Sequence, residues 1–117
     1  MRKALLVLPA LLLPALVYGN DYPTEARVQY VFECMADHGG QSYGNLYKCS
    51  CAIDRIAAAM PYEKFVEADT YTRGRGVMGE RGGEFRDPPR GKKMREELAQ
   101  VEKQAKLSCF PGEVTAR

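Results

Sequence analysis

Four cysteines and a single histidine are the residues with the clearest chemistry in this chain of 117 residues. Cys49 and Cys51 stand one residue apart, with Cys34 before them and Cys109 close to the C-terminus. His38 follows Cys34 by four residues, the spacing that places two side chains on the same face of a helix. Such a set can form disulfides, bind a metal or exchange electrons, and the elements that carry it decide between these.

The segment 44–60 is predicted to be a helix, with Asn45 as its N-terminal cap. Cys51 lies about 200° around the axis from Cys49, because an α-helix has about 3.6 residues per turn. A Cys49–Cys51 disulfide would therefore break the helix. The apolar side chains recur at spacings of three and four, as expected of a core-facing stripe: Leu46, Cys49, Ile53, Ile56 and Met60.

Two disulfide pairings then remain, 34–49 with 51–109 and 34–51 with 49–109. Either pairing joins the 44–60 helix both to the preceding helix and to the C-terminal helix. We favour 34–49 with 51–109, because Cys34 and Cys49 lie almost symmetrically about a turn near Gln41. Each bond should stabilise the fold by about 3 kcal/mol, because it restricts the unfolded chain. This is a large share of the stability of a small domain.

The alternative hypothesis is a zinc or copper site made of three thiolates and an imidazole, Cys34, His38, Cys49 and Cys51. The divergence of Cys49 and Cys51 on one helix weakens it, as does an oxidising compartment. The sequence has no Cys-x-x-Cys and no Cys-x-x-Cys-His motif, and no serine lies in a nucleophile elbow. We therefore expect a protein that is not an enzyme and holds no cofactor.

Residues 1–19 are typical of a cleaved signal peptide: a basic start, an apolar run and Gly19 at the cleavage point. Pro9 and Pro14 interrupt the run, which is too short to span a membrane, so no span is expected after cleavage. Removal of Arg2 and Lys3 leaves 15 basic residues against 15 acidic ones. A neutral mature chain argues against nucleic-acid binding. The signal peptide and the even number of cysteines predict a periplasmic or secreted protein.

Further helices are predicted at 24–38, 61–72 and 92–110, which gives an all-α bundle of three or four helices stapled by two disulfides. Residues 20–110 form the single domain, and residues 111–117 are expected to be a disordered tail. Thr24 is the expected cap of the first helix. The side chains expected in the core are Val28, Val31, Phe32, Met35, Phe65, Val66, Met94, Leu98, Val101 and Ala105.

Residues 73–93 contain six glycines, two prolines and seven basic against three acidic residues, and we expect them to form a long flexible loop before the last helix. Guanidinium groups pair with carboxylates, so this loop is the predicted contact surface for an acidic partner, while Phe85 fastens its middle to the bundle. The predicted partner-binding residues are Arg73, Arg75, Arg81, Phe85 and Arg86.

The pattern YVFECMADHGG, LYKCSCAIDRIA, YEKFVEADTY and the Cys-Phe at 109–110 resembles a group of short exported proteobacterial proteins of unknown function. Some of these accompany quinoprotein, PQQ-dependent alcohol dehydrogenase systems. The resemblance covers residues 28–110 and implies a non-enzymatic periplasmic accessory role with a protein partner, without assigning a catalytic residue. Besides the metal-binding alternative, a periplasmic chaperone is a third hypothesis.

Overall fold

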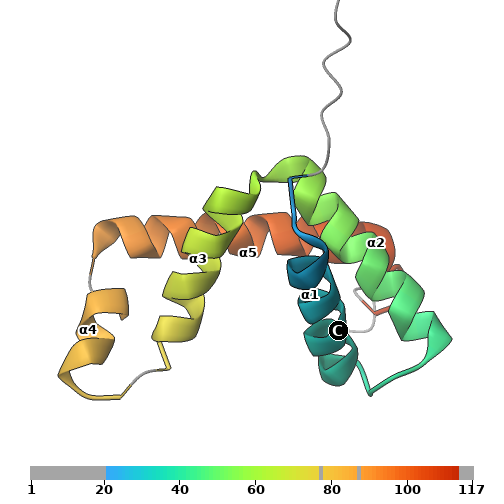
Figure 1. Cartoon of the computed structure of the whole chain (residues 1–117), viewed down its shortest axis with the longest axis horizontal. Helices are drawn as coiled ribbons and strands as arrows, with labels where there is room; N and C mark the ends of the chain where they lie inside the picture. Colours follow the sequence, from blue (N-terminus) through green and yellow to red (C-terminus); the bar gives the residue numbers. More distant parts are fainter. Residues whose placement is uncertain (1–20, 77, 87, 114–117) are drawn as a thin grey trace, which may run out of the picture.

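The computed structural model describes residues 21–76, 78–86 and 88–113, and these residues form helices and connecting turns without a strand. The all-α prediction is confirmed. The predicted signal peptide lies outside the described residues. The described residues form five helices in chain order: α1 (Thr24–Asp37), α2 (Tyr43–Ala59), α3 (Tyr62–Gly74), α4 (Glu80–Arg86) and α5 (Pro89–Cys109) (Figure 1).

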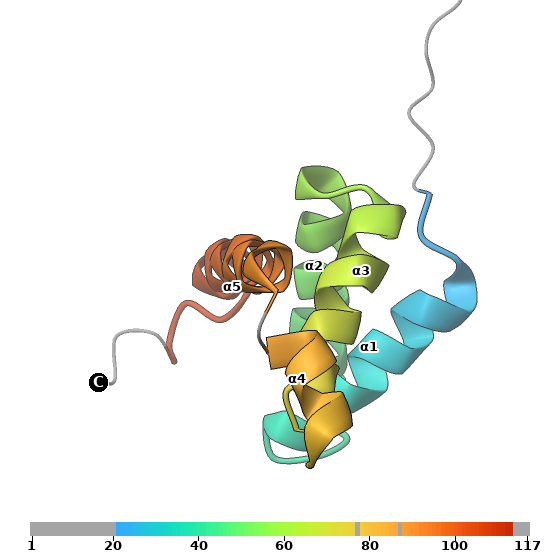
Figure 2. The ribbon, with the colours of Figure 1, turned by 90° about the vertical axis from the view of Figure 1, so that its left-hand side faces the viewer.

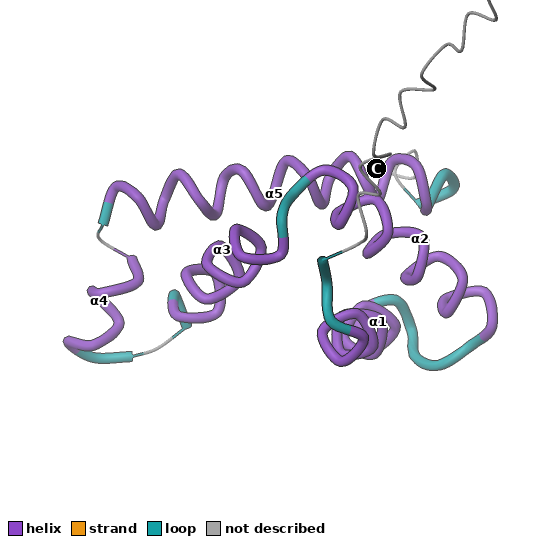
Figure 3. The backbone as a smooth tube through the Cα atoms, turned by 45° about the horizontal axis from the view of Figure 1, so that its top comes forward, coloured by secondary structure: helices purple, strands orange, loops and turns teal. Residues whose placement is uncertain are grey.

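Helix α5 is the longest helix and lies across the others (Figure 1). Helices α2 and α3 both pack against it, α1 packs against α2, and α4 contacts α3 and α5 at the opposite end. Seen from the side, α2 and α3 lie between α5 and α1 (Figure 2), an order that a third view repeats (Figure 3). None of the helices among the described residues is long and apolar enough to cross a membrane.

The turn between α1 and α2 is fixed by side chains of its own. Gly39 and Gly40 adopt positive φ angles of 93° and 103°, which favour glycine, and the Gly40 N–H donates to the Met35 carbonyl at 2.8 Å. Ser42 is the N-cap of α2, because its hydroxyl accepts from the Asn45 N–H at 3.1 Å. The prediction of Asn45 as the cap is therefore wrong by one turn.

Residues 21 and 22 fasten the start of the chain to the bend between α2 and α3. The Asp21 carboxylate accepts from the Tyr62 N–H at 2.9 Å and thus occupies the open start of α3. The Tyr22 hydroxyl donates to the Met60 carbonyl at 2.9 Å. Thr24 is the first residue of α1 and makes no capping bond, since Pro23 holds the cap position, so that predicted cap is wrong.

The apolar core has two parts. The larger cluster lies between α1, α2 and the end of α5, and Cys49, Ile53, Ile56 and Phe110 are almost fully buried in it. The smaller cluster lies between α3 and α5 and consists of Met60, Ala68, Met94 and Leu98. Phe65 and Val101 pack against both clusters and connect them.

Several predicted core residues are exposed instead. Val28 and Phe32 lie on the outer face of α1, because α1 packs against α2 on one side and buries Cys34 and Met35 there. Leu46 lies on the neighbouring part of α2 and is also exposed. On α3 the fully buried residue is Ala68, whose small side chain allows close packing, while Val66 faces solvent and Phe65 is half-buried.

Residues 73–93 are mostly helical, so the prediction of a flexible loop is wrong. A Cβ atom on Gly74 would overlap the Phe85 ring, and one on Gly91 would approach the Tyr71 ring, so these glycines permit close helix packing. Within this segment only Gly79 among the described residues requires a positive φ angle. Pro89 stands in the first turn of α5, where proline costs no hydrogen bond.

The described part of the predicted disordered tail is a turn. Residues 111–113 follow α5, and the Glu113 N–H donates to the Phe110 carbonyl at 3.2 Å. Residues 114–117 lie outside the described residues.

Candidate functional site

The two neighbouring cysteines of α2 bond to different helices. Cys49 is joined to Cys34 of α1 and Cys51 to Cys109 of α5, and no free cysteine remains in the described part of the chain. The pairing favoured from the sequence is confirmed. Cys49 is completely buried, whereas Cys51 is half-buried at the edge of the core. Disulfides of this kind are compatible with an extracellular or periplasmic protein.

His38 lies beside the first disulfide and is held there by four contacts. Its Nδ1 atom donates to the Cys34 carbonyl at 2.8 Å, and its ring stacks on Phe110 with 4.5 Å between the ring centroids. Its Nε2 atom lies 3.6 Å from a carboxylate oxygen of Glu113, and its Nδ1 atom lies 3.9 Å from the Cys34 sulfur. Lys48 lies 3.6 Å from the other oxygen of Glu113. These contacts hold the C-terminal turn against α1 and α2.

The predicted metal set is brought together in part. Potential ligand atoms of Cys34, His38 and Cys49 lie within 4.8 Å of one another. Cys51 is bonded to Cys109 and is not part of this cluster, so the structure brings three of the four predicted ligands together. Metals bind cysteine as the thiolate, and both remaining sulfurs are already bonded to each other. In the oxidised protein this cluster therefore serves packing and crosslinking.

Arg73, a predicted partner contact, instead connects α1 to α3. Its guanidinium group donates to Glu33 of α1 and to Asp69 of α3, each at 2.6 Å. Hydrogen bonding to Arg73 lowers the pKa of the Glu33 carboxyl below its ordinary value, and a bond from Gln29 contributes. A small cleft of about 190 Å³ lies between α1 and α3 at this ion pair, with Tyr30 and Phe65 among its lining residues.

Two half-buried groups at the contact of α1, α3 and α5 have raised pKa values. Burial raises the pKa of Tyr30 to about 12, and the carboxylates of Glu102 and Asp37 contribute. Burial also raises the pKa of Glu102, although the nearby Lys106 opposes this. Tyr30 therefore keeps its proton at neutral pH and is a poor candidate for a general base.

The remaining residues of the predicted partner surface lie around α4. Phe85 packs over Gly74, and its carbonyl accepts from Arg95 at 2.6 Å, so the prediction that Phe85 fastens this segment is confirmed. Arg75 and Arg81 are exposed, and neither forms an ion pair with another described residue. Arg86 is exposed at the end of α4. All four predicted arginines therefore lie on the surface, but Arg73 is paired with carboxylates of the same molecule, and Phe85 is half-buried.

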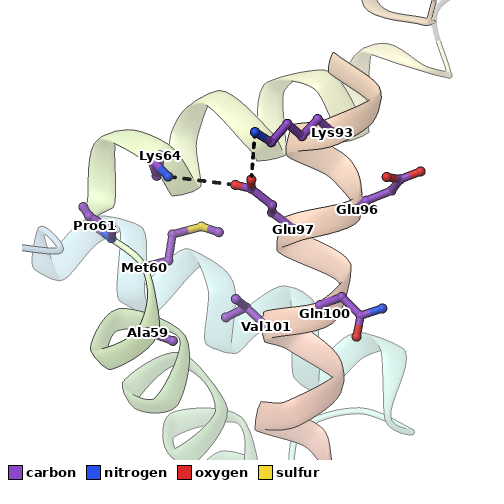
Figure 4. A pocket seen from close by; sticks show the side chains of 9 residues that line it. All are labelled: Ala59, Met60, Pro61, Lys64, Lys93, Glu96, Glu97, Gln100 and Val101. Atoms are coloured by element: carbon purple, nitrogen blue, oxygen red, sulfur yellow. Dashed lines mark ion pairs between the residues drawn. The ribbon is translucent and has the colours of Figure 1, made fainter. Parts of the chain in front are cut away.

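A broad groove lies between α5 and the bend from α2 to α3 and has a volume of about 790 Å³ (Figure 4). Lys64 and Lys93 both reach towards Glu97, at 3.9 Å and 4.0 Å, above Met60 and Val101. Its lining includes no histidine, cysteine or serine.

Sequence reasoning missed one surface, because it placed the residues concerned in the core. Val28 and Phe32 of α1 and Leu46 of α2 are exposed, and so are Tyr43 and Tyr47 of α2. A shallow apolar groove of about 490 Å³ lies among Phe32, Met35, Gln41, Ser42, Tyr43 and Leu46. The spacing of four between Tyr43 and Tyr47, outside the stripe of Cys49, Ile53 and Ile56, was the available signal.

No protein-family model matches this chain, and neither a curated protein nor a solved structure is similar enough to match it.

Proposed function

We propose that this protein is an exported, non-enzymatic accessory protein that docks on an acidic surface of a periplasmic partner. The docking surface is the basic segment around α4, residues 73–93, which we call the α4 end. The observation that carries the proposal is the uneven distribution of charge. Residues 73–93 contain seven basic and three acidic residues, whereas residues 21–72 contain eight acidic and four basic ones. The formally neutral mature chain therefore has a basic region and an acidic remainder, which orients it towards a charged partner.

The arrangement of the arginines supports this proposal. Arg73 and Arg90 are paired with carboxylates of the same molecule, at 2.6 Å and 2.7 Å. Arg75 and Arg81 stay exposed around α4, which lies at one end of the molecule (Figure 1). Exposed guanidinium groups form bidentate hydrogen bonds with carboxylates. Arg75 and Arg81 are therefore the residues that we assign to the contact.

The proposed partner is a quinoprotein alcohol dehydrogenase system, on the basis of the resemblance described above. The crosslinked helix pair supplies a rigid support, and the proposed role requires no catalytic group. In this proposal the chain binds the dehydrogenase or one of its subunits and supports its assembly or activity. Electrostatic docking predicts association that is fast at low salt and weakens as salt is added.

The test measures binding of the purified protein to the purified dehydrogenase of the same organism at about 20 and 200 mM salt. The double variant Arg75→Glu/Arg81→Glu should weaken binding about tenfold or more, because it places like charges across the contact. Arg55→Glu/Lys103→Glu makes the same change of charge on exposed residues outside the α4 end and should bind like the wild type.

Two outcomes would contradict different parts of the proposal. If the dehydrogenase does not bind at either salt concentration, the assigned partner is wrong. If it binds but both double variants and added salt leave the affinity unchanged, docking through α4 is wrong. In cells that lack the gene, the Arg55/Lys103 variant should restore PQQ-dependent alcohol oxidation better than the Arg75/Arg81 variant.

A further inference from the structure

An apolar surface lies on the α1–α2 pair, away from α4 (Figure 1). It consists of five exposed side chains, which we call the outer face: Val28, Phe32, Tyr43, Leu46 and Tyr47. Tyr43 is 81% exposed and Tyr47 73%, so both tyrosines leave their rings in water. Large apolar side chains that gather on the surface of a small domain mark an interaction site more often than scattered ones do.

The surface is built on a rigid support. The Cys34–Cys49 disulfide joins α1 and α2, and Met35, next to Cys34, forms the floor of the apolar groove. The side-chain amide of Asn45 donates to the His38 and Gly40 carbonyls at 2.8 Å each, which holds the turn at the rim of the groove. A preformed surface loses little conformational entropy when it is covered.

The absence of charged residues from the lining of this groove favours self-association. A two-fold symmetric interface places the same patch of both copies face to face, so any charge in it meets its own like charge. None of the six residues that line the groove is charged. The α4 end, where Arg75 and Arg81 are exposed, would place guanidinium groups against each other. Of these two surfaces, the outer face is the one that can pair with itself.

The area of the outer face suits a modest interface. An aromatic side chain buries about 150–250 Å² when it is fully covered, so Phe32, Tyr43 and Tyr47 at their exposed fractions supply about 400 Å² per copy. A standard interface buries about 800 Å² per partner. The three aromatic residues supply about half of this, and Val28, Leu46 and the groove walls add to it.

We infer that two copies of this chain associate through their outer faces, with the aromatic side chains of each copy against the apolar groove of the other. The dimer carries its two basic α4 ends on opposite sides, since α4 lies at the end of the molecule remote from α1 and α2 (Figure 3). We expect the dimer to dissociate in roughly the micromolar range, as transient complexes with modest interfaces do.

The test is sedimentation velocity of the purified, oxidised protein from about 1 to 500 µM, a range that brackets a micromolar dissociation constant. The wild type should change from monomer to dimer across this range. Phe32→Asp should raise the dissociation constant about 30-fold or more, because it removes a central aromatic contact and places two like charges at the interface. Its thermal unfolding should stay close to that of the wild type, since Phe32 is 54% exposed.

Met78→Asp is the matched control. Met78 is the most exposed large apolar residue, at 92%, and it precedes α4, so this variant should dimerise like the wild type. A wild type that stays monomeric at 500 µM overturns the inference, as does equal loss of dimer in both variants. If Tyr43→Asp dimerises like the wild type, another surface of the chain forms the dimer. Dimerisation is measured without the dehydrogenase, so it stands or fails separately from docking through α4.

Discussion

The molecule consists of two halves that hold their helices together in different ways. The half made of α1, α2 and the last turns of α5 has both disulfides and the larger apolar cluster, with Cys49, Ile56 and Phe110 at its centre. The half made of α3, α4 and the first turns of α5 has no disulfide among its described residues. Its cluster contains four buried residues, and glycines and ion pairs complete the packing.

The difference shows how a small domain can combine a rigid region with one that tolerates adjustment. Crosslinks act on the unfolded chain and stabilise whichever helices they join, whatever the size of the core. Close packing at Gly74 and Gly91 depends on the folded contacts alone, and the contact of Gly74 with Phe85 is lost as soon as α4 moves. We therefore expect hydrogen exchange to be slower in α1 and α2 than in α4.

Removing a disulfide should cause the largest loss of stability of all the changes considered. Cys51 and Cys109 are 58 residues apart in sequence, so their bond closes a longer loop than Cys34–Cys49, which spans 15 residues. Loop closure predicts a loss of about 4 kcal/mol for Cys51→Ala/Cys109→Ala and about 3 kcal/mol for Cys34→Ala/Cys49→Ala. Urea unfolding at pH 7 measures both losses.

The order of the two losses is informative as well as their size. If the Cys34–Cys49 pair costs more, strain or core packing around the buried Cys49 outweighs the loop term. If neither pair costs more than about 1 kcal/mol, the crosslinks are not what separates the two halves, because the loop term alone predicts several times that loss.

Gly74→Ala should cause the next largest loss of stability. The structural change should be confined to the half without disulfides. The added methyl group meets the Phe85 ring, so α4 must move away or the ring must leave its site. Overpacking of this kind costs about 1–3 kcal/mol. Hydrogen exchange should accelerate in residues 80–86 and remain unchanged in α2.

Gly44→Ala is the control for this prediction. A Cβ atom at Gly44 has open space in the first turn of α2, with the Ser42 hydroxyl oxygen 3.9 Å away as its nearest neighbour. Alanine there should leave stability unchanged or raise it by up to about 1 kcal/mol, because glycine is the poorer helix former. Equal destabilisation by both variants would mean that the Phe85 contact is not what Gly74 provides.

The half with both disulfides was the more predictable one from the sequence. The stripe of Cys49, Ile53 and Ile56 identified the buried side of α2, and the divergence of Cys51 from it excluded a Cys49–Cys51 bond. The near-symmetry of Cys34 and Cys49 about the turn then favoured the pairing that the structure has. Periodicity did not reveal which part of α1 stays uncovered. Val28 and Phe32 fit an apolar face, but α1 packs mainly on α2 and therefore buries a narrower strip than the pattern suggests.

Residues 73–93 were mispredicted because glycine has two physical uses. It frees the backbone in turns, as Gly79 does with its φ angle of 87°, and it lets side chains approach a helix closely, as Gly74 and Gly91 do. The sequence alone does not separate these uses. The role of Arg73 was equally hidden, because its partner Glu33 is 40 residues away in the chain.

The ion pairs of Arg73 should make a smaller contribution that depends on pH. Arg73→Ala should cost about 0.2–1 kcal/mol at pH 7, since all three side chains are partly exposed. The pKa of Glu33 is lowered in the folded protein, so this stability is present above the unfolded pKa and is lost as the pH falls through the folded pKa. Urea unfolding of both proteins should therefore converge once the pH lies below the lowered pKa of Glu33. Arg75→Ala should differ from the wild type at neither pH.

Glu102→Gln should cause the smallest change in the free energy of unfolding, and it should raise stability rather than lower it. Burial raises the pKa of Glu102 in the folded protein, with Asp69 contributing and Lys106 opposing. The folded state therefore holds this proton more tightly, so stability is highest below the unfolded pKa and falls as the pH rises through the folded pKa. The glutamine variant avoids the cost of a half-buried charge and should unfold at slightly higher urea at pH 7, by up to about 0.5 kcal/mol. A gain that is as large at pH 3 as at pH 7 would mean that side-chain packing, rather than the charge of Glu102, sets the difference.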